Sequence, residues 1–207
     1  MTTLYLSGFS SFEGVEANPT EDVLRFLSGG DPLVPHACVK ECIDVLEVST
    51  SAINDYFDRV QVSSNNISIH LGVNSKATTF QLEQIAHNNM TFRVPDVKGF
   101  QPNNEPIDDT QELDNMCCTG FAVHDVCAKL KEEGFKCEVS FDPGRYCCNF
   151  IYWKSLQHQE KVGANVKRAI FIHVPPFSVI GKEMQILFVQ RVVKLLCEEQ
   201  SAEACIA

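Results

Sequence analysis

The sequence predicts an α/β protein, a three-layer α/β/α sandwich of the phosphorylase or hydrolase type with a mixed, largely parallel central sheet. Short apolar segments with the period of a strand alternate along the chain with segments that have the apolar spacing of helices. The connections between these segments are mostly short, which favours parallel strands joined by helical crossovers. Because no internal repeat, low-complexity tract or linker interrupts the pattern, we expect residues 1–207 to form a single domain.

The first half of the chain predicts three strands separated by two helices. Asn18, Pro19 and Thr20 begin the first helix, because a capping side chain there precedes a proline at the first helical position. That helix stops at Gly29-Gly30. The expected elements are a strand over 4–9, a helix from 18 onwards, a strand over 37–48, a helix over 51–60 and a strand over 67–73.

The second half predicts three further strands and three helices around a long loop. Prolines and many Asn and Asp residues make 92–111 a loop, and a loop of this size is more often functional than idle. Thr119 is expected to cap a helix that Gly134 ends. The rest of the expected elements are strands over 80–86, 136–141 and 169–174, a turn at 142–144, and helices over 147–156 and 185–199.

Charge and composition exclude several classes of partner. The chain holds 27 acidic and 17 basic residues, a formal net charge of −10, which argues against nucleic acid or an anionic membrane surface. No apolar run approaches the roughly 20 residues that span a bilayer, and the first residues have no signal-peptide pattern. We therefore expect a cytoplasmic protein whose 10 cysteines are free thiols. The cysteine spacing does not match a zinc site, so no metal is expected.

Cys148 is the first candidate for a reactive group. It follows the turn Asp142-Pro143-Gly144 and lies near the start of an expected helix. Unpaired N–H groups and the helix dipole favour a thiolate at such a position, and the thiolate is the nucleophilic form of cysteine. The alternative interpretation is a small core residue, because most free cysteines pack as apolar side chains.

A thiol nucleophile needs an imidazole within hydrogen-bonding distance and a group that orients the imidazole. His173 ends an apolar strand and is followed closely by two prolines, which places it at a sheet edge where loops converge. His70 and His87 also lie in strand-like segments and compete for this role. Glu83 is a candidate for the orienting carboxylate, although a single Glu on a strand is usually a solvated charge.

Five segments together resemble the pyroglutamyl-peptidase I family, the cytosolic pyrrolidone-carboxylate cysteine peptidases. Each motif alone is modest, but their order and gaps match across nearly the whole chain. The segments are Ser7-Gly8-Phe9-Ser10-Ser11-Phe12-Glu13-Gly14 with Asn18-Pro19; His70-Leu71-Gly72-Val73; Leu82-Glu83-Gln84-Ile85-Ala86-His87-Asn88 with Phe92-Arg93-Val94-Pro95-Asp96; residues 142–149 with Tyr152; and Phe171-Ile172-His173-Val174-Pro175-Pro176.

The resemblance implies a thiol protease that removes an N-terminal pyroglutamyl residue from peptides through a thioester, without a cofactor or metal. The family's nucleophile is the Cys directly before Asn, which is Cys148 here, and the family's His and Glu are His173 and Glu83. Arg93 is implied in support of the oxyanion. The residues implied to bind the lactam ring or to line its pocket are Phe9, Phe12, Asn18, Val73 and Cys147.

Two departures from the family pattern affect the expected pocket. Pro143 stands where many members have Ala, and Asn74-Ser75 stands where many bacterial members have Gly-Gly.

Three other functions stay open. A purine-phosphorylase-like enzyme would need a basic or glycine-rich phosphate loop, and the sequence has no such motif. A non-catalytic binder of pyroglutamyl peptide ends is the second possibility, and a thiol-redox protein with a Cys147–Cys148 disulfide is the third. The sequence predicts neither the oligomeric state nor the physiological peptides.

Overall fold

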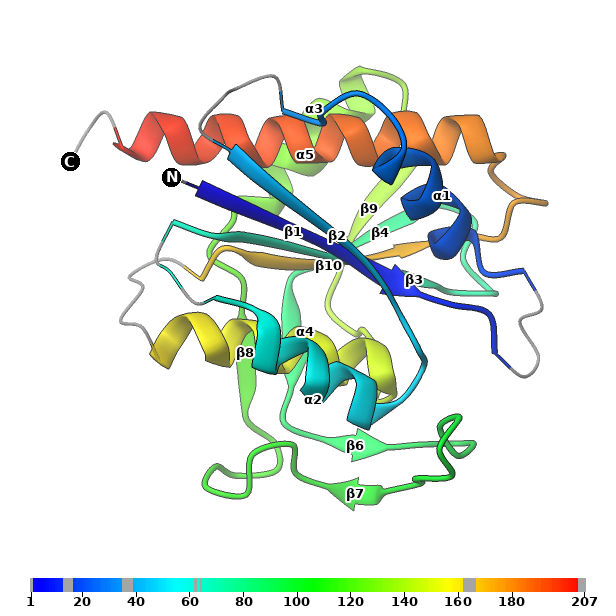
Figure 1. Cartoon of the computed structure of the whole chain (residues 1–207), viewed down its shortest axis with the longest axis vertical. Coiled ribbons are helices and arrows are strands. Elements are labelled where there is room, and N and C mark those ends of the chain that lie inside the picture. Colours follow the sequence, from blue (N-terminus) through cyan, green and yellow to red (C-terminus); the bar gives the residue numbers. More distant parts are fainter. Residues whose placement is uncertain are drawn as a thin grey trace.

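A six-stranded sheet forms the centre of the protein, seen in a computed structural model that describes residues 2–12, 17–34, 39–61, 63, 65–161 and 167–204 (Figure 1). The strand order is β2-β1-β3-β10-β4-β9. Only the β4–β10 pair is antiparallel within this sheet, which confirms the mixed, largely parallel arrangement. The strands are β1 (Thr2–Phe9), β2 (Val39–Leu46), β3 (Ile67–Val73), β4 (Phe80–Glu83), β9 (Cys137–Ser140) and β10 (Ala169–Val174).

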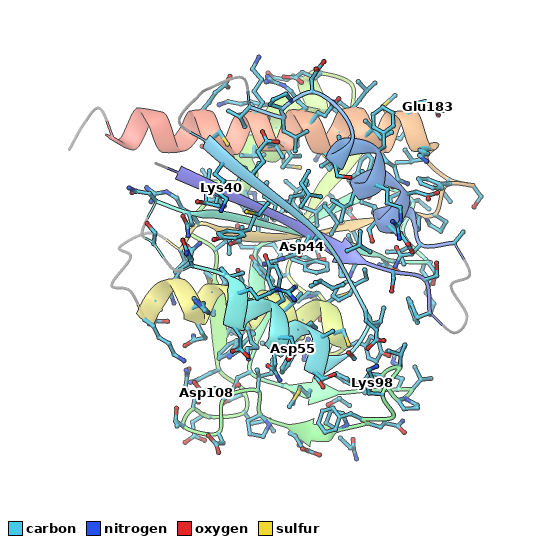
Figure 2. The ribbon with its side chains drawn as sticks, viewed as in Figure 1. Lys40, Asp44, Asp55, Lys98, Asp108 and Glu183 are labelled. Carbon is cyan, nitrogen blue, oxygen red and sulfur yellow. The ribbon has the colours of Figure 1, made fainter. Side chains whose placement is uncertain are left out.

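Helices cover both faces of this sheet and confirm the predicted three layers (Figure 1). One face carries α1 (Pro19–Ser28), α3 (Val123–Glu132) and α5 (Lys182–Ala204), and its core is mostly Leu, Ile and Val. The second face carries α2 (Thr50–Arg59) and α4 (Cys147–Lys161), and its core is rich in aromatic rings. We call these the aliphatic face and the aromatic face. Most charged side chains lie on the surface, as exposed Lys40, Asp55, Lys98 and Glu183 illustrate (Figure 2).

Local sequence explains where the amphipathic helices begin. The Asn18 side chain accepts a hydrogen bond from the Thr20 amide, and Pro19 follows as the first residue of α1. Ser49 caps α2 in the same way, by accepting from the Ala52 amide. Helix α4 differs because it is buried around most of its circumference. Its position on the sheet beside α2 therefore depends on tertiary contacts more than on an amphipathic pattern.

The prediction of one strand over 80–86 is wrong, because the chain changes partners at Gln84. The Gln84 amide donates to the Ser140 carbonyl, and the Gln84 carbonyl accepts from the Thr119 amide. Glu83 therefore ends β4 in the central sheet, and Ile85 begins a different strand. That strand, β5 (Ile85–His87), pairs with β8 (Met116–Cys118), which the sequence pattern did not predict.

The predicted loop over 92–111 contains a short strand, β7 (Asn103–Glu105), which pairs with β6 (Met90–Thr91). The prediction that Thr119 caps α3 is also wrong, because Ala122 occupies the N-cap position. The Thr119 hydroxyl instead accepts from the Phe121 amide in the preceding turn. Two predicted glycine positions are confirmed. Gly134 closely follows the end of α3, Gly144 lies in the turn before α4, and both have a left-handed backbone conformation.

Several predicted boundaries differ by a few residues. Helix α5 is longer than the 185–199 expected. Residues 13–14 of the first motif and residues 37–38 of an expected strand lie outside the described residues. Within the described ranges, no helix is both long and apolar enough to cross a membrane.

Candidate active site

Cys148 lies in the first turn of α4, close to the backbone of β3. A Cβ atom added to Gly72 would lie 2.9 Å from the Cys148 sulfur and 2.6 Å from the Phe171 ring. Real Cβ atoms do not approach neighbouring atoms that closely, so glycine at this position leaves the space that the sulfur occupies. This glycine belongs to the His70–Val73 segment recognised in the sequence. The sequence alone does not show that it makes room for a sulfur atom.

The two adjacent sulfurs have different environments. Cys147 is buried in the aromatic core, and this burial raises the pKa of its thiol far above the ordinary value. Cys148 is half-buried and contacts the same core from its edge. Cys147 is therefore held as a neutral packing residue, whereas Cys148 is the sulfur that remains accessible to another molecule.

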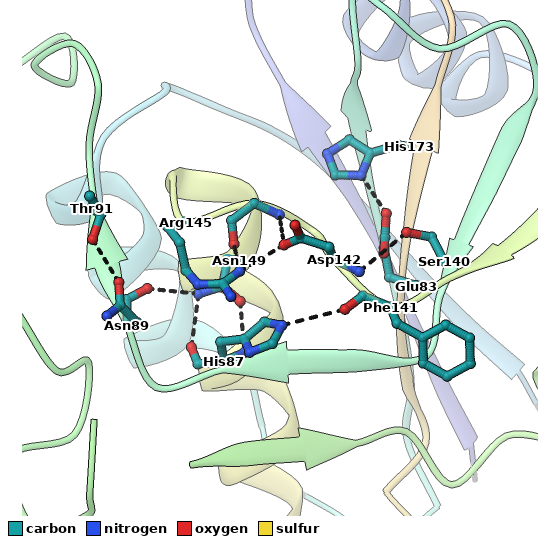
Figure 3. A network of polar contacts seen from close by, with 11 residues as sticks. Glu83, His87, Asn89, Thr91, Ser140, Phe141, Asp142, Arg145, Asn149 and His173 are labelled. Atoms are coloured by element: carbon teal, nitrogen blue, oxygen red, sulfur yellow. Dashed lines mark hydrogen bonds and ion pairs between the residues drawn. The ribbon is translucent and has the colours of Figure 1, made fainter. Parts of the chain in front are cut away.

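His173 meets Cys148 at the carboxyl end of β10. In the pairing of β10 with β3, His173 lies opposite Gly72, the residue that the Cys148 sulfur approaches. The Cys148 side chain lies close enough to the His173 ring to raise the pKa of the imidazole. The His173 Nδ1 atom lies 2.8 Å from the Glu83 Oε1 atom, and both side chains are buried (Figure 3). Because Nδ1 is engaged by the carboxylate, Nε2 is the ring nitrogen left for the thiol.

The charges around His173 outweigh its burial. Burial by itself lowers the pKa of His173, but the hydrogen bonds and negative charges of Cys148 and Glu83 raise it to about 9. The imidazole therefore keeps its proton at neutral pH and can pair with a thiolate. The second Glu83 oxygen, Oε2, is buried and has no hydrogen-bond partner among the described residues.

Asn149 and Tyr152 hold α4 against the strands that supply Glu83. The Asn149 amide accepts from the His87 N–H at 2.8 Å and donates to the carbonyls of His87 and Asn89 (Figure 3). The Tyr152 hydroxyl donates to the Glu83 carbonyl at 2.8 Å. Both residues belong to a motif recognised in the sequence, but their positioning role depends on β4 and β5 having different partners, which the sequence pattern did not indicate.

Arg93 lies in the loop beside α4 and is exposed. Two contacts fasten this loop to the aromatic face. Buried Asp96 accepts from the Thr50 amide at the start of α2, and backbone hydrogen bonds lower the pKa of Asp96 although burial alone raises it. The Tyr146 hydroxyl donates to the Pro95 carbonyl just before α4 begins. The loop that carries Arg93 is thus tied to both helices of this face, whereas the groups that act on the charge of the His173 ring are Cys148 and Glu83.

Some of the predicted pocket residues lie at strand ends or at the edge of the aromatic core, and one of them supports the neighbouring loop. Phe9 is buried at the end of β1, and Phe12 packs against the same aromatic core at its edge. Val73 is half-buried at the end of β3, opposite Val174. The Asn18 amide is fully engaged within the chain, donating to the Ser10 carbonyl and accepting from Thr20. Asn18 therefore shapes the loop between the two phenylalanines and α1.

The two competing histidines have different partners. His70 is fully buried, and its Nδ1 atom lies 2.7 Å from the Ser7 hydroxyl; burial lowers the pKa of His70 to about 3. The His87 ring contacts the Phe141 carbonyl, and burial followed by the charge of Arg145 lowers its pKa. Both rings therefore stay neutral at pH 7, and His173 has the partners expected of the catalytic base.

Two hollows lie outside this cluster. One of about 490 Å³ adjoins the α4 turn and is lined by His87, Asn89, Asn104, Glu112, Leu113, Asp114 and Arg145. Another, of about 720 Å³, lies on the aliphatic face between α1 and α5. Within the described ranges, no group of three or more His, Cys, Asp or Glu side chains is arranged to hold a metal ion.

Comparison with known proteins gives one consistent result. The profile of the pyroglutamyl peptidase family matches residues 2–199. The pyrrolidone-carboxylate peptidase of Thermococcus litoralis is 28% identical over 186 residues, which cover 88% of this chain and 81% of that protein. The Bacillus subtilis pyrrolidone-carboxylate peptidase is 25% identical over 193 residues, covering 92% and 87%. The crystal structure of the Pyrococcus furiosus pyrrolidone carboxyl peptidase superimposes with a TM-score of 0.82 at 25% identity, covering 96% of this chain and 99% of that one.

Proposed function

Because the chain belongs to the pyroglutamyl peptidase family, we propose that Cys148, His173 and Glu83 form the catalytic triad of a cysteine peptidase. The protein removes an N-terminal pyroglutamyl residue from peptides. The observation that supports the triad is the chain of contacts from the Glu83 carboxylate through the His173 ring to the Cys148 thiol. The comparisons favour neither a purine phosphorylase nor a non-catalytic binder.

In the first half of the reaction, the Cys148 thiolate attacks the carbonyl that joins pyroglutamate to the next residue. The negative charge on the tetrahedral oxygen develops near the N-terminus of α4, where backbone N–H groups and the helix dipole favour an anion. Arg93 is assigned to support of this charge from the neighbouring loop. His173 then gives its proton to the leaving amine, and a thioester remains on Cys148.

In the second half, His173 removes a proton from water, and the resulting hydroxide attacks the thioester carbonyl. Collapse of the second tetrahedral intermediate releases pyroglutamate and returns the proton to the Cys148–His173 pair. Glu83 keeps Nδ1 hydrogen-bonded throughout, so the imidazole presents Nε2 to the thiol and to the leaving group. No step in this sequence requires a redox change or an external cofactor.

Recognition of the lactam is assigned to the aromatic loop and the neighbouring strand end. Pyroglutamate is a neutral five-membered ring with one N–H and one ring carbonyl, and therefore fits an aromatic slot with a few directed hydrogen bonds. Phe9 and Phe12 are the proposed walls, with Val73 and Cys147 on the remaining sides. Asn18 contributes by fixing the loop that carries Phe12.

We extend the proposal to the whole chain. Residues 1–207 act as one peptidase domain, since the triad draws on β4, β10 and α4 across the same sheet. The cytoplasm is the proposed location, because Cys148 is a free thiol and the reaction needs a reduced sulfur. Nucleic acid and membranes are not proposed partners.

Hydrolysis of a pyroglutamyl arylamide tests this function. The wild-type protein is expected to release the arylamine, and Cys148→Ala is expected to reduce kcat/KM by at least about 10⁴-fold with an unchanged melting temperature. Cys147→Ser alters the adjacent sulfur, which is assigned to the pocket wall and not to the attack, and should therefore keep its activity with at most a change in KM. An inactive Cys147→Ser together with an active Cys148→Ser would show that the nucleophile has been assigned to the wrong residue.

A further inference from the structure

A second sulfur contact lies away from the triad, between β8 and the segment that enters β10. The Lys167 Nζ atom is 3.0 Å from the Cys117 sulfur. The same Nζ atom is 2.7 Å from the Glu160 Oε2 atom on α4. An amine, a thiol and a carboxylate thus meet at one point, and the catalytic mechanism uses none of them.

The chain holds this arrangement in place from both sides. The Lys167 carbonyl accepts from the Gly120 amide at 2.8 Å, which binds the backbone of Lys167 to the end of β8. The Gln157 amide contacts the Cys117 sulfur from α4. Cys117 itself is only 4% exposed, but the side chains of Lys167 and Glu160 beside its sulfur are 26% and 54% exposed, so the sulfur lies just beneath the surface.

We propose that Cys117 and Lys167 form a covalent sulfur–nitrogen crosslink when the protein meets hydrogen peroxide. In the ground state the contact is a hydrogen bond from the Lys167 ammonium to the sulfur. Because the donor nitrogen already lies at the sulfur, an oxidised sulfur has a nucleophile beside it before any second thiol can reach it. The modified site is therefore this pair, with a peroxide as its co-substrate.

The chemistry balances in two steps. The Cys117 sulfur displaces water from hydrogen peroxide, so that the thiol becomes a sulfenic acid and peroxide is reduced to water. Glu160 accepts a proton from the Lys167 ammonium, and the free amine then attacks the sulfenic sulfur and expels a second water. The product is a sulfenamide that has lost two hydrogens relative to the reduced pair. A thiol reductant reverses it: one thiol attacks the sulfur and releases the amine, which leaves a mixed disulfide on Cys117, and a second thiol then frees the Cys117 thiol.

This crosslink would join two segments that support the triad. Cys117 pairs with Ala86 on β5, which follows Glu83 closely, and Lys167 precedes β10, which carries His173. The two residues are separated by 50 positions in the chain, so the bond would close a long loop and restrict the unfolded chain. The expected consequence is a protein that is more resistant to heat after mild oxidation.

The experiment treats the full-length protein with hydrogen peroxide and maps its peptides by mass spectrometry before and after a thiol reductant. We expect a reductant-sensitive pair of peptides containing Cys117 and Lys167, lighter by two hydrogens than their sum. We also expect a melting temperature about 5 to 10 °C higher than in the reduced protein. Peptide mapping is needed because the Cys127 and Cys137 sulfurs, 3.5 Å apart, would lose the same mass in a disulfide.

Two variants serve as controls. Lys167→Arg keeps the positive charge beside Glu160 but has no nucleophilic amine at neutral pH, and it should abolish both the crosslink and the thermal shift. Cys118→Ser removes the neighbouring sulfur and should leave both unchanged. A Cys117–Cys118 disulfide in the wild type, a thermal shift that persists in Lys167→Arg, or the absence of the linked peptides would each overturn the proposal.

Discussion

The two faces of the sheet share their strands but differ in what they bury. The aliphatic face packs Leu, Ile and Val from α1, α3 and α5 into a core with few polar groups. The aromatic face packs Tyr56, Tyr152, Trp153 and Phe171 beside the buried polar groups of the catalytic cluster. A buried charge is tolerated only where it has a partner, and the Glu83–His173 pair meets this condition. This difference indicates that the aliphatic face contributes mainly to stability, whereas the aromatic face carries the catalytic groups.

The largest effect should follow from removing the imidazole on the aromatic face. His173→Ala deletes the group that pairs with the thiolate and protonates the leaving amine, so kcat/KM is expected to fall by about 10⁴-fold. Hydrolysis of a pyroglutamyl arylamide measures this loss. Circular dichroism should show an unchanged fold, and residual activity above about one tenth of wild type would contradict the assignment.

Glu83→Gln should have a smaller effect because the orienting group is changed while the thiol and imidazole remain. We expect kcat/KM to fall roughly 100- to 1000-fold, less than for His173→Ala. In the pH–rate profile of the wild type, the alkaline limb, over which kcat/KM falls, should lie near pH 9, where His173 loses its proton. Without the Glu83 charge the pKa of His173 falls, so this limb should move to lower pH. An unmoved limb in the pH–rate profile would show that Glu83 does not act on His173.

Two glycine substitutions compare the faces directly. In Gly72→Ala, the new methyl group collides with the Cys148 sulfur and the Phe171 ring, so we expect a loss of roughly 10- to 100-fold in kcat/KM. In Gly8→Ala, the methyl group collides with Leu24 and Thr20 on the aliphatic face at 2.9 Å. That change should lower the melting temperature and reduce kcat/KM less than Gly72→Ala does, because it reaches the site only through the Thr20 contacts to Phe9 and Asn18. Equal catalytic losses in the two variants would remove the distinction between the faces.

The smallest catalytic effect should come from the aliphatic core. Leu196 on α5 is fully buried there, and Leu196→Ala should reduce the free energy of unfolding by about 2 to 5 kcal/mol. Chemical denaturation measures this cost. At a temperature where the variant is folded, kcat/KM should stay within about twofold of wild type, and a loss comparable to that of Gly72→Ala would mean that the two faces are coupled.

The sequence could predict the central sheet because its strands are short apolar runs and because a helix start such as Asn18-Pro19 has a recognisable capping pattern. It could also bring Cys148 and His173 forward as candidates, since they lie at an expected helix start and an expected strand end. Glu83 lies inside an expected strand, and the family resemblance was needed to single it out. The break at Gln84 could not be predicted in this way. Residues 80–86 have one continuous strand pattern, and their change of partner depends on contacts with Ser140 and Thr119 that are remote in the chain.

The same limit applies to the supports of the site. Gly72 matters because a sulfur from α4 lies against it, and Asn149 matters because it spans to β5. Neither role is a property of local sequence, since each needs two elements brought together by the fold. Thr119 shows the converse error, where a good capping residue is used by the preceding turn instead of by the helix.

Alkylation of Cys148 at neutral pH tests the central claim most directly. Iodoacetamide should modify Cys148 much faster than Cys147 at pH 7, because the protonated His173 ring favours the thiolate of Cys148 while Cys147 is buried. Peptide mapping identifies the sulfur, and in His173→Ala the rate at pH 7 should fall at least about 10-fold, because the positively charged ring beside the sulfur is removed. Equal alkylation rates of Cys148 in the wild type and in His173→Ala would contradict the thiolate–imidazolium pair.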